Sequence, residues 1–175
     1  SWRVDNAAEV GEFRVVSLSM TSQNWREGLW THQILIVEPP KVRNPDIAFL
    51  FITGEGKGEK YLDLLKKLSS EAGAVAAVVN RVPNQPLYDG RKEDVLIAHT
   101  FKKYMETGDE TWPLLFPMAK STVRAMDTVA EQTKKSHGRD VTRFVVSGAS
   151  KRGWTTWLTG AVDPRVKGIA PMVID

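Results

Sequence analysis

The alternation of hydrophobic and polar residues along the chain predicts a sheet whose strands are joined by helices. Apolar and polar positions alternate over 13–21 and 31–37, as in strands with one buried face. Residues 47–53 and 74–79 are apolar at successive positions, which is typical of central parallel strands. The two remaining expected strands cover 141–147 and 166–173. We therefore expect a mostly parallel sheet with antiparallel strands near the N-terminus.

Helical periodicity separates these strands. Leu62, Leu65 and Leu68 fall on one stripe, and Gly73 is a typical helix-ending residue. The other expected helices cover 93–105, 117–135 and 152 to about 162. Alternating strands and helices predict the α/β class, with helices on both faces of one sheet. This is the layout of an α/β-hydrolase-type three-layer sandwich.

Nothing in the pattern marks a boundary within residues 1–175, so we expect a single domain. The first residue is Ser1, and the chain stops on a segment that is typical of a buried strand. We therefore interpret 1–175 as the N-terminal part of a hydrolase domain through about strand 6, without its C-terminal remainder. A fragment of this kind is expected to be inactive by itself.

Composition excludes several classes of function. The content of 42% hydrophobic and 26% charged residues is that of a globular protein. A net charge of +3 spread along the chain does not favour nucleic-acid binding. With zero cysteines and three scattered histidines, neither a metal site nor a cofactor site is expected. Because no run of 18 apolar residues occurs, we expect no membrane span.

The segment Val145–Gly153 predicts a nucleophile elbow, in which a serine sits on a sharp turn from a strand to a helix. Ser150 is the expected nucleophile, and Gly148 and Gly153 are the small residues that such a turn needs. Arg152 departs from the usual esterase pattern, which has glycine two positions after the serine. The alternative is that Ser150 only caps the following helix.

An acyl-transfer site also needs backbone N–H groups that bind the oxyanion. One donor is expected from Lys151, at the start of a helix, and the other from the loop that begins at Gly54. Lys151 and Arg152 oppose the helix dipole, so we hypothesise that one of them binds an anionic group or supports the oxyanion. The alternative for both is a solvated charge on the helix surface.

The catalytic base is not identified among these residues. His32, His99 and His137 all precede Ser150, whereas the histidine of this fold follows the serine and the acid. Asp175, at the end of an expected strand, is a candidate acid. Carboxylates in the first turn of a helix normally complement its dipole, and Glu93 and Asp94 are interpreted in that way.

Several segments together resemble the PhoPQ-activated pathogenicity-related family. The residues that carry this resemblance lie in 82–87, 93–98, 112–118, 126–127, 144–158, 163–166 and 171–175. The resemblance implies an α/β-hydrolase fold, secretion or periplasmic export, and a serine hydrolase site whose acid and histidine lie beyond Asp175. The elbow is also similar to that of glucuronoyl esterases, in which a basic residue follows the serine.

The resulting hypothesis is a serine hydrolase of esterase type. Its substrate is expected to be a small-molecule or saccharide ester, with Arg152, Asn84 and Gln85 as candidate substrate-binding residues. The alternative is a non-catalytic secreted signalling protein, of proliferation-repressor type, on the same fold. Fold alone does not separate these two hypotheses.

Overall fold

The computed structural model describes residues 1–26, 28–56 and 58–174. Within these residues one sheet of seven strands has the order β1-β2-β3-β5-β4-β6-β7. The strands are β1 (Trp2–Val10), β2 (Phe13–Trp25), β3 (Gly28–Glu38), β4 (Ile47–Ile52), β5 (Val75–Val79), β6 (Arg143–Ala149) and β7 (Val166–Met172). The helices are α1 (Leu62–Ala72), α2 (Glu93–Thr107), α3 (Leu115–His137) and α4 (Lys151–Val162), with a 3₁₀ turn at Gly58–Tyr61.

The sheet is antiparallel at one side and parallel at the other. Strands β1, β2 and β3 pair in antiparallel fashion, and β3 also runs antiparallel to β5. Strands β5, β4, β6 and β7 are parallel to one another. This mixed arrangement confirms the expected α/β-hydrolase-type sheet with antiparallel N-terminal strands.

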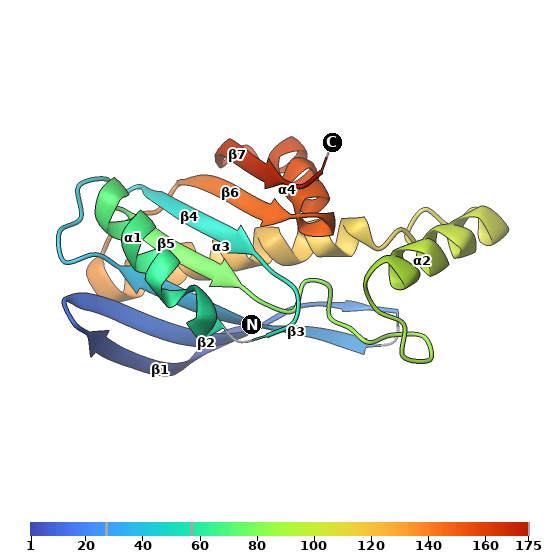
Figure 1. Cartoon of the computed structure of the whole chain (residues 1–175), viewed down its shortest axis with the longest axis horizontal. Helices are drawn as coiled ribbons and strands as arrows, with labels where there is room; N and C mark the ends of the chain where they lie inside the picture. Colours follow the sequence, from blue (N-terminus) through green and yellow to red (C-terminus); the bar gives the residue numbers. More distant parts are fainter. Residues whose placement is uncertain (27, 57, 175) are drawn as a thin grey trace.

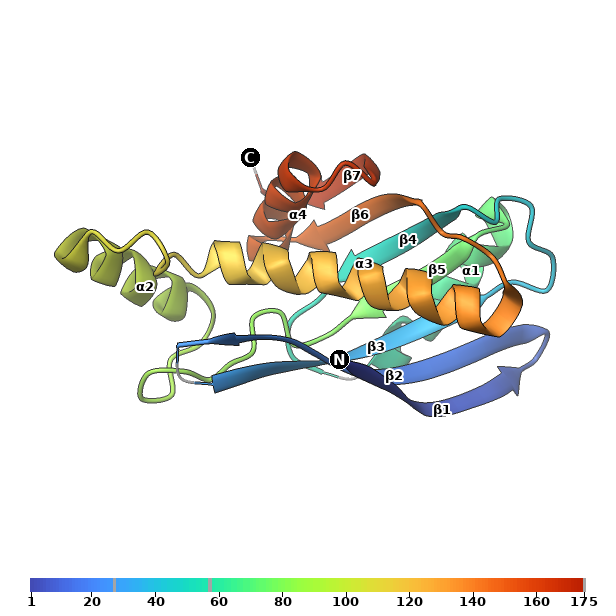
Figure 2. The same ribbon diagram turned by 180° about the vertical axis from the view of Figure 1, so that it is seen from behind.

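Helices cover both faces of the sheet (Figures 1 and 2). Helix α1 lies on one face, and α3 and α4 lie on the other. Alternate residues of β3 show how both faces are buried: Ile34 and Ile36 pack toward α3, whereas Leu35 and Val37 pack beneath α1. A strand buried on both sides needs apolar residues at successive positions. The three expected layers are therefore present.

Strand β1 was not among the expected strands. It is an edge strand, and its charged residues Arg3, Asp5 and Glu9 are exposed. Charges on an edge strand discourage pairing with other chains, but they also weaken the hydrophobic alternation that identifies a strand in a sequence. Strands β2 and β3 also extend beyond the expected ranges. The additional residues at the end of β2 and the start of β3 pair with each other.

Helix α2 projects beyond the carboxyl ends of the parallel strands (Figure 1). It is fixed to the body of the protein by a few buried groups, including Leu96 and Thr100. The Thr100 hydroxyl accepts a hydrogen bond of 3.2 Å from the backbone N–H of Leu114. Because ligands of open α/β sheets bind at this edge, α2 stands beside the expected site.

Candidate active site

Ser150 forms a strained turn between β6 and α4. Its φ of 56° and ψ of −127° are unusual for a residue with a side chain, and the residue is exposed to solvent. The Ser150 backbone N–H donates to the Met172 carbonyl at 2.8 Å, and its own carbonyl accepts from the Trp154 N–H at 3.0 Å. Adjacent strand β7 and the first turn of α4 therefore hold this conformation. The sharp strand-to-helix turn is therefore present, and its role as a nucleophile elbow stays a prediction.

The glycines on either side of Ser150 are required by close packing. A Cβ atom at Gly148 would lie 2.7 Å from the carbonyl oxygen of Arg152. At Gly153 a Cβ atom would lie 2.6 Å from Ile174 Cγ2 and 2.9 Å from the Met172 carbonyl oxygen. Real Cβ atoms do not approach backbone atoms so closely, so only glycine fits either position without movement.

The expected oxyanion loop follows β4 on the same edge of the sheet. Its start is hydrogen-bonded to the loop after β5, because Arg81 N–H donates to the Gly54 carbonyl at 2.7 Å and Val82 N–H donates to the Thr53 carbonyl at 3.0 Å. The Thr53 hydroxyl donates to the Asn80 side-chain oxygen at 2.8 Å. The loops after β4 and β5 are therefore hydrogen-bonded to each other at the edge of the sheet where Ser150 lies.

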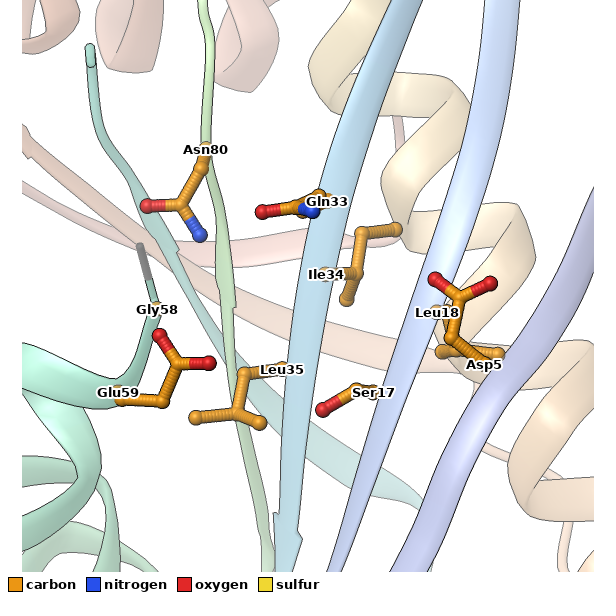
Figure 3. Close-up of a pocket in the computed structure, with 9 residues that line it drawn as sticks. All are labelled: Asp5, Ser17, Leu18, Gln33, Ile34, Leu35, Gly58, Glu59 and Asn80. Atoms are coloured by element: carbon orange, nitrogen blue, oxygen red, sulfur yellow. The ribbon is translucent and has the colours of Figure 1, made fainter. Parts of the chain in front are cut away.

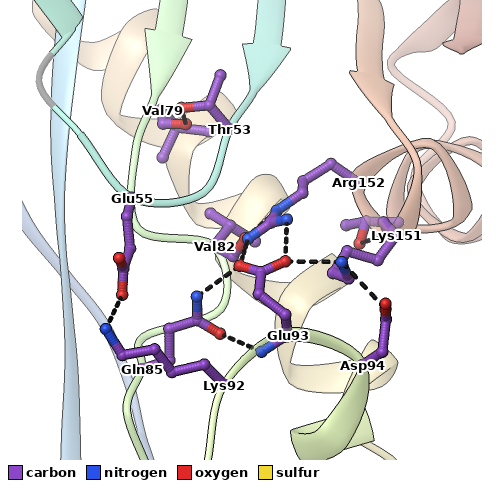
Figure 4. Close-up of polar contacts among 11 residues, drawn as sticks. Thr53, Glu55, Val79, Val82, Gln85, Lys92, Glu93, Asp94, Lys151 and Arg152 are labelled. Carbon is purple, nitrogen blue, oxygen red and sulfur yellow. Dashed lines mark hydrogen bonds and ion pairs between the residues drawn. The ribbon is translucent and has the colours of Figure 1, made fainter.

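Arg152 contacts both of these loops and is only 9% exposed. Its guanidinium packs against Gly54, where a Cβ atom would lie 2.3 Å from Nη2. Nε donates to the Val82 carbonyl at 2.6 Å. Nη1 and Nη2 each donate to one oxygen of the Glu93 carboxylate at 2.7 Å, as Figure 4 shows. Arg152 thus connects α4 to the two loops and to α2.

Lys151 joins the same network. Its ammonium lies 2.7 Å from Glu93 Oε2 and 3.0 Å from Asp94 Oδ1, and its side chain is only 10% exposed. The hydrogen bond from Arg152 is the largest influence that lowers the pKa of Glu93 to about 2, and Lys151 and Gln85 act in the same direction against desolvation. The Glu93 carboxylate is therefore ionised at any physiological pH. These carboxylates explain how two cations are accommodated at the start of α4.

The other expected substrate-binding residues lie on the loop after β5. Gln85 donates from Nε2 to Glu93 Oε1 at 2.5 Å and accepts from the Glu93 backbone N–H at 2.9 Å. Asn84 donates from Nδ2 to the Thr31 carbonyl at 2.8 Å. The structure therefore brings Gln85 and Arg152 to the same carboxylate, and their role in substrate binding stays a prediction. Asp175, the candidate acid, lies outside the described residues.

The three histidines have partners away from the elbow, and no hydrogen bond joins any of them to Ser150 in the described part of the chain. His32 is buried, with Nε2 2.8 Å from the Ser22 hydroxyl. The ring of His99 packs against that of Tyr88, with centroids 4.8 Å apart and planes tilted by 36°. His137 ends α3 and pairs with the buried Glu38.

An apolar pocket of about 390 Å³ lies along α4, one turn from Ser150. Trp154 and Leu158 of α4, Phe101 of α2, and Pro113 and Phe116 near the start of α3 contribute to its walls. Trp154 stacks on Phe101 with ring centroids 6.3 Å apart. Trp154 is joined to the Ser150 turn through its backbone, because its N–H donates to the Ser150 carbonyl at 3.0 Å.

A smaller pocket of about 130 Å³ lies between β1, β2, β3 and the 3₁₀ turn (Figure 3). Polar groups from Asp5, Ser17, Gln33, Glu59 and Asn80 line it. It contains none of the expected site residues. Within the described ranges, no group of three or more His, Asp or Glu residues is placed to hold a metal. No helix of this part is long and apolar enough to cross a membrane.

Sequence comparisons place these features in the context of known proteins. The model of the family described as PhoPQ-activated pathogenicity-related protein matches residues 1–175. Autocrine proliferation repressor protein A of Dictyostelium discoideum is 34% identical over 190 residues, a match that covers 99% of this chain and 38% of that protein. The chain therefore spans less than half the length of this curated relative.

Solved structures with the same fold include esterases. A glucuronoyl esterase from Solibacter usitatus has a TM-score of 0.63 at 16% identity, over 98% of this chain and 51% of that chain. An acetyl xylan esterase from Paenibacillus sp. R4 has a TM-score of 0.65 at 15% identity, over 97% of this chain and 52% of that chain. Identities this low support the α/β-hydrolase fold alone.

Proposed function

The chain belongs to the PhoPQ-activated pathogenicity-related family, and we propose that it carries the nucleophile and oxyanion loop of a serine esterase. In this proposal Ser150 Oγ forms a bond to the carbonyl carbon of an ester while its proton passes to a base. The alcohol leaves with a proton, and water then hydrolyses the acyl-enzyme to release the acid.

The observation that carries the proposal is the backbone of Ser150. A serine with a φ of 56° that is exposed at the carboxyl end of β6, a parallel strand inside the sheet, is both strained and accessible. Strain of this kind persists at functional sites where the surrounding structure holds it. The side-chain oxygen of a serine that only capped α4 would accept a hydrogen bond from a backbone N–H in the first turn, but no side-chain cap hydrogen bond is formed at Ser150.

The oxyanion is assigned to two backbone donors, one at the start of α4 and one on the loop after β4. The Lys151 N–H is at the positive end of α4, where negative charge is favoured. The second donor is assigned to the loop at Gly54, which packs on the Arg152 guanidinium. The base and the acid are assigned, by resemblance to the family, to residues outside those described.

An ester of a small molecule or a saccharide is the proposed substrate. The apolar pocket beside Trp154 supports this class, because aromatic walls can receive an alkyl group or the apolar face of a sugar ring. The solved structures of similar fold are named as a glucuronoyl esterase and an acetyl xylan esterase, which agrees with the proposal at the level of fold. Export from the cytoplasm is proposed from the family resemblance.

Hydrolysis of p-nitrophenyl acetate by the full natural chain tests this function. We expect Ser150→Ala to lower kcat/KM by about 10³-fold or more, since removing the nucleophile of a serine hydrolase leaves only binding and oxyanion contributions. Ser147→Ala is a matched control, because Ser147 lies on β6, three residues before Ser150, and its hydroxyl donates to the Ala170 carbonyl. Equal activity in Ser150→Ala and the unmodified protein would contradict the proposal.

A second candidate function is signalling without catalysis. The name of the Dictyostelium relative, autocrine proliferation repressor protein A, favours this alternative. It predicts that Ser150→Ala retains full activity in a cell-proliferation assay with added purified protein. Loss of repression in Ser150→Ala, with normal folding, would instead connect repression to the serine.

A further inference from the structure

The first turn of α2 is the point where the loops of the proposed site meet (Figure 4). Lys92, just before the helix, pairs at 2.8 Å with Glu55 on the Gly54 loop. Glu93 pairs with Arg152 of α4 and exchanges two hydrogen bonds with Gln85 on the loop after β5. Residues from two loops and two helices are therefore connected through one turn of helix.

Glu93 is held firmly in this position. Its carboxylate accepts two parallel hydrogen bonds from Arg152, one from Gln85 and an ion pair from Lys151. Its φ of 52° lies in the left-handed region, which a residue with a side chain adopts only when its surroundings determine it. The backbone N–H of Glu93 is fixed as well, by the side-chain oxygen of Gln85.

The Arg152 guanidinium links the carboxylate of Glu93 to the loops of the proposed active site. A buried cation requires a paired anion, and among the described residues Glu93 is the carboxylate that contacts it. The planar guanidinium forms a fork that fixes both distance and orientation. Gly54 packs directly against that fork, and Val82 accepts from Nε. A shift of Glu93 therefore moves the surface on which the Gly54 loop rests.

We propose that Glu93 is a positioning residue that aligns the elbow and the Gly54 loop through Arg152 and Lys151. The inference rests on the proposed function, because it assigns the alignment to the oxyanion donors of that site. Oxyanion donors act only when they are aimed closely at the developing charge, and a displacement of about 1 Å can lower the rate by about 10²-fold. Glu93 itself touches neither the substrate nor the reacting atoms in this account.

The test compares three variants of the full natural chain with the unmodified protein. Glu93→Gln removes the charge and keeps the shape. Glu93→Gln combined with Arg152→Met also removes the buried cation, and replacing a buried ion pair by apolar groups is often neutral for stability. Glu106→Gln is the control, because Glu106 lies on the same helix, is exposed, and forms its ion pairs among the described residues with the neighbouring Lys102 and Lys103.

We expect Glu93→Gln to lower kcat for p-nitrophenyl acetate by about 10- to 100-fold with KM little changed. The double variant should regain the melting temperature of the unmodified protein, because no unpaired buried cation is left. Its kcat should stay low, because the Arg152 guanidinium that aligns the Gly54 loop is missing. Recovery of kcat together with the melting temperature would overturn the inference, since Glu93 would then only neutralise a buried charge. Glu106→Gln should match the unmodified protein in both measurements.

Hydrogen–deuterium exchange separates this inference from the proposed function. In Glu93→Gln, faster exchange is expected in peptides covering 148–156 and 52–56, with peptides remote from the Glu93 contacts unchanged, whether or not the protein hydrolyses esters. Unchanged exchange in both peptides would overturn the inference. An unmodified protein without Ser150-dependent hydrolysis would overturn the proposed function, while the exchange result would still decide the coupling.

Discussion

The guanidinium of Arg152 and the carboxylate of Glu93 are joined by two hydrogen bonds of 2.7 Å, although the residues are 59 positions apart in the chain. This pair explains the departure of the elbow from the usual esterase pattern. Where many esterases have glycine, two positions after the serine, this chain has an arginine that reaches across to α2. The unusual residue is thereby part of the scaffold that surrounds the serine.

The packing around Gly148 predicts a loss of stability in Gly148→Ala. The added methyl group would lie 2.7 Å from a backbone oxygen, so the elbow has to move, at a cost of about 1–3 kcal/mol in the free energy of unfolding. Chemical denaturation measures this change. Gly168→Ala is the control, because its methyl group would lie 3.6 Å from Val145, an ordinary contact. Equal stability of the two variants would contradict this account of the elbow.

The strain at Ser150 predicts that glycine is more stable than alanine at this position. Both variants lack the hydroxyl, but only glycine adopts a φ of 56° without steric cost. We expect Ser150→Gly to exceed Ser150→Ala by about 1 kcal/mol in the free energy of unfolding, after allowing for the greater flexibility of glycine in the unfolded chain. A Ser150→Ala variant that is the more stable of the two would show that the turn is not strained.

His32 predicts a loss of stability in mild acid. Burial lowers its pKa from 6.5 to about 4, so the folded protein keeps it neutral while the unfolded chain takes up a proton below pH 6.5. The free energy of unfolding should therefore fall between pH 6.5 and 4, by about 3 kcal/mol at most. His32→Gln lacks this titration, so the pH dependence of its stability should be flatter. Parallel curves for the two proteins would contradict the prediction.

The pocket beside α4 predicts a dependence on the acyl group of the substrate. Trp154→Ala removes one aromatic wall, so the KM for p-nitrophenyl butyrate should rise several-fold, whereas that for p-nitrophenyl acetate should change little. Trp157→Ala is the control, because Trp157 lies on the same helix, is 53% exposed and does not line this pocket. The same change in KM for both esters, or in both variants, would exclude the pocket as an acyl subsite.

Local patterns were sufficient to predict most of the fold. Helix α1 ends where its sequence indicates, at Gly73, which has a φ of 61° and closes the helix. The buried strands β4 and β5 were recognised because both of their faces are apolar. The edge strand β1 was missed because its residues are mostly exposed and therefore show no hydrophobic period.

The candidate site was less accessible to sequence reasoning. The sharp turn at Ser150 could be predicted because its strand, glycines and helix are contiguous in the chain, whereas its role as a nucleophile elbow stays a prediction. The partnership of Glu93 with Arg152 is a long-range contact, and in sequence the two residues belong to separate helices. One signal was present: two adjacent cations at the start of a helix oppose its dipole, so they require carboxylates from elsewhere.

Labelling of the full natural chain by a fluorophosphonate probe tests the central claim most directly. An activated serine forms a bond to phosphorus as fluoride leaves, and the adduct can be located by mass spectrometry of the digested protein. We predict one labelled peptide that contains Ser150, and no labelling in Ser150→Ala. Absence of labelling in the unmodified protein, or equal labelling in Ser150→Ala, would contradict the claim that Ser150 is the nucleophile.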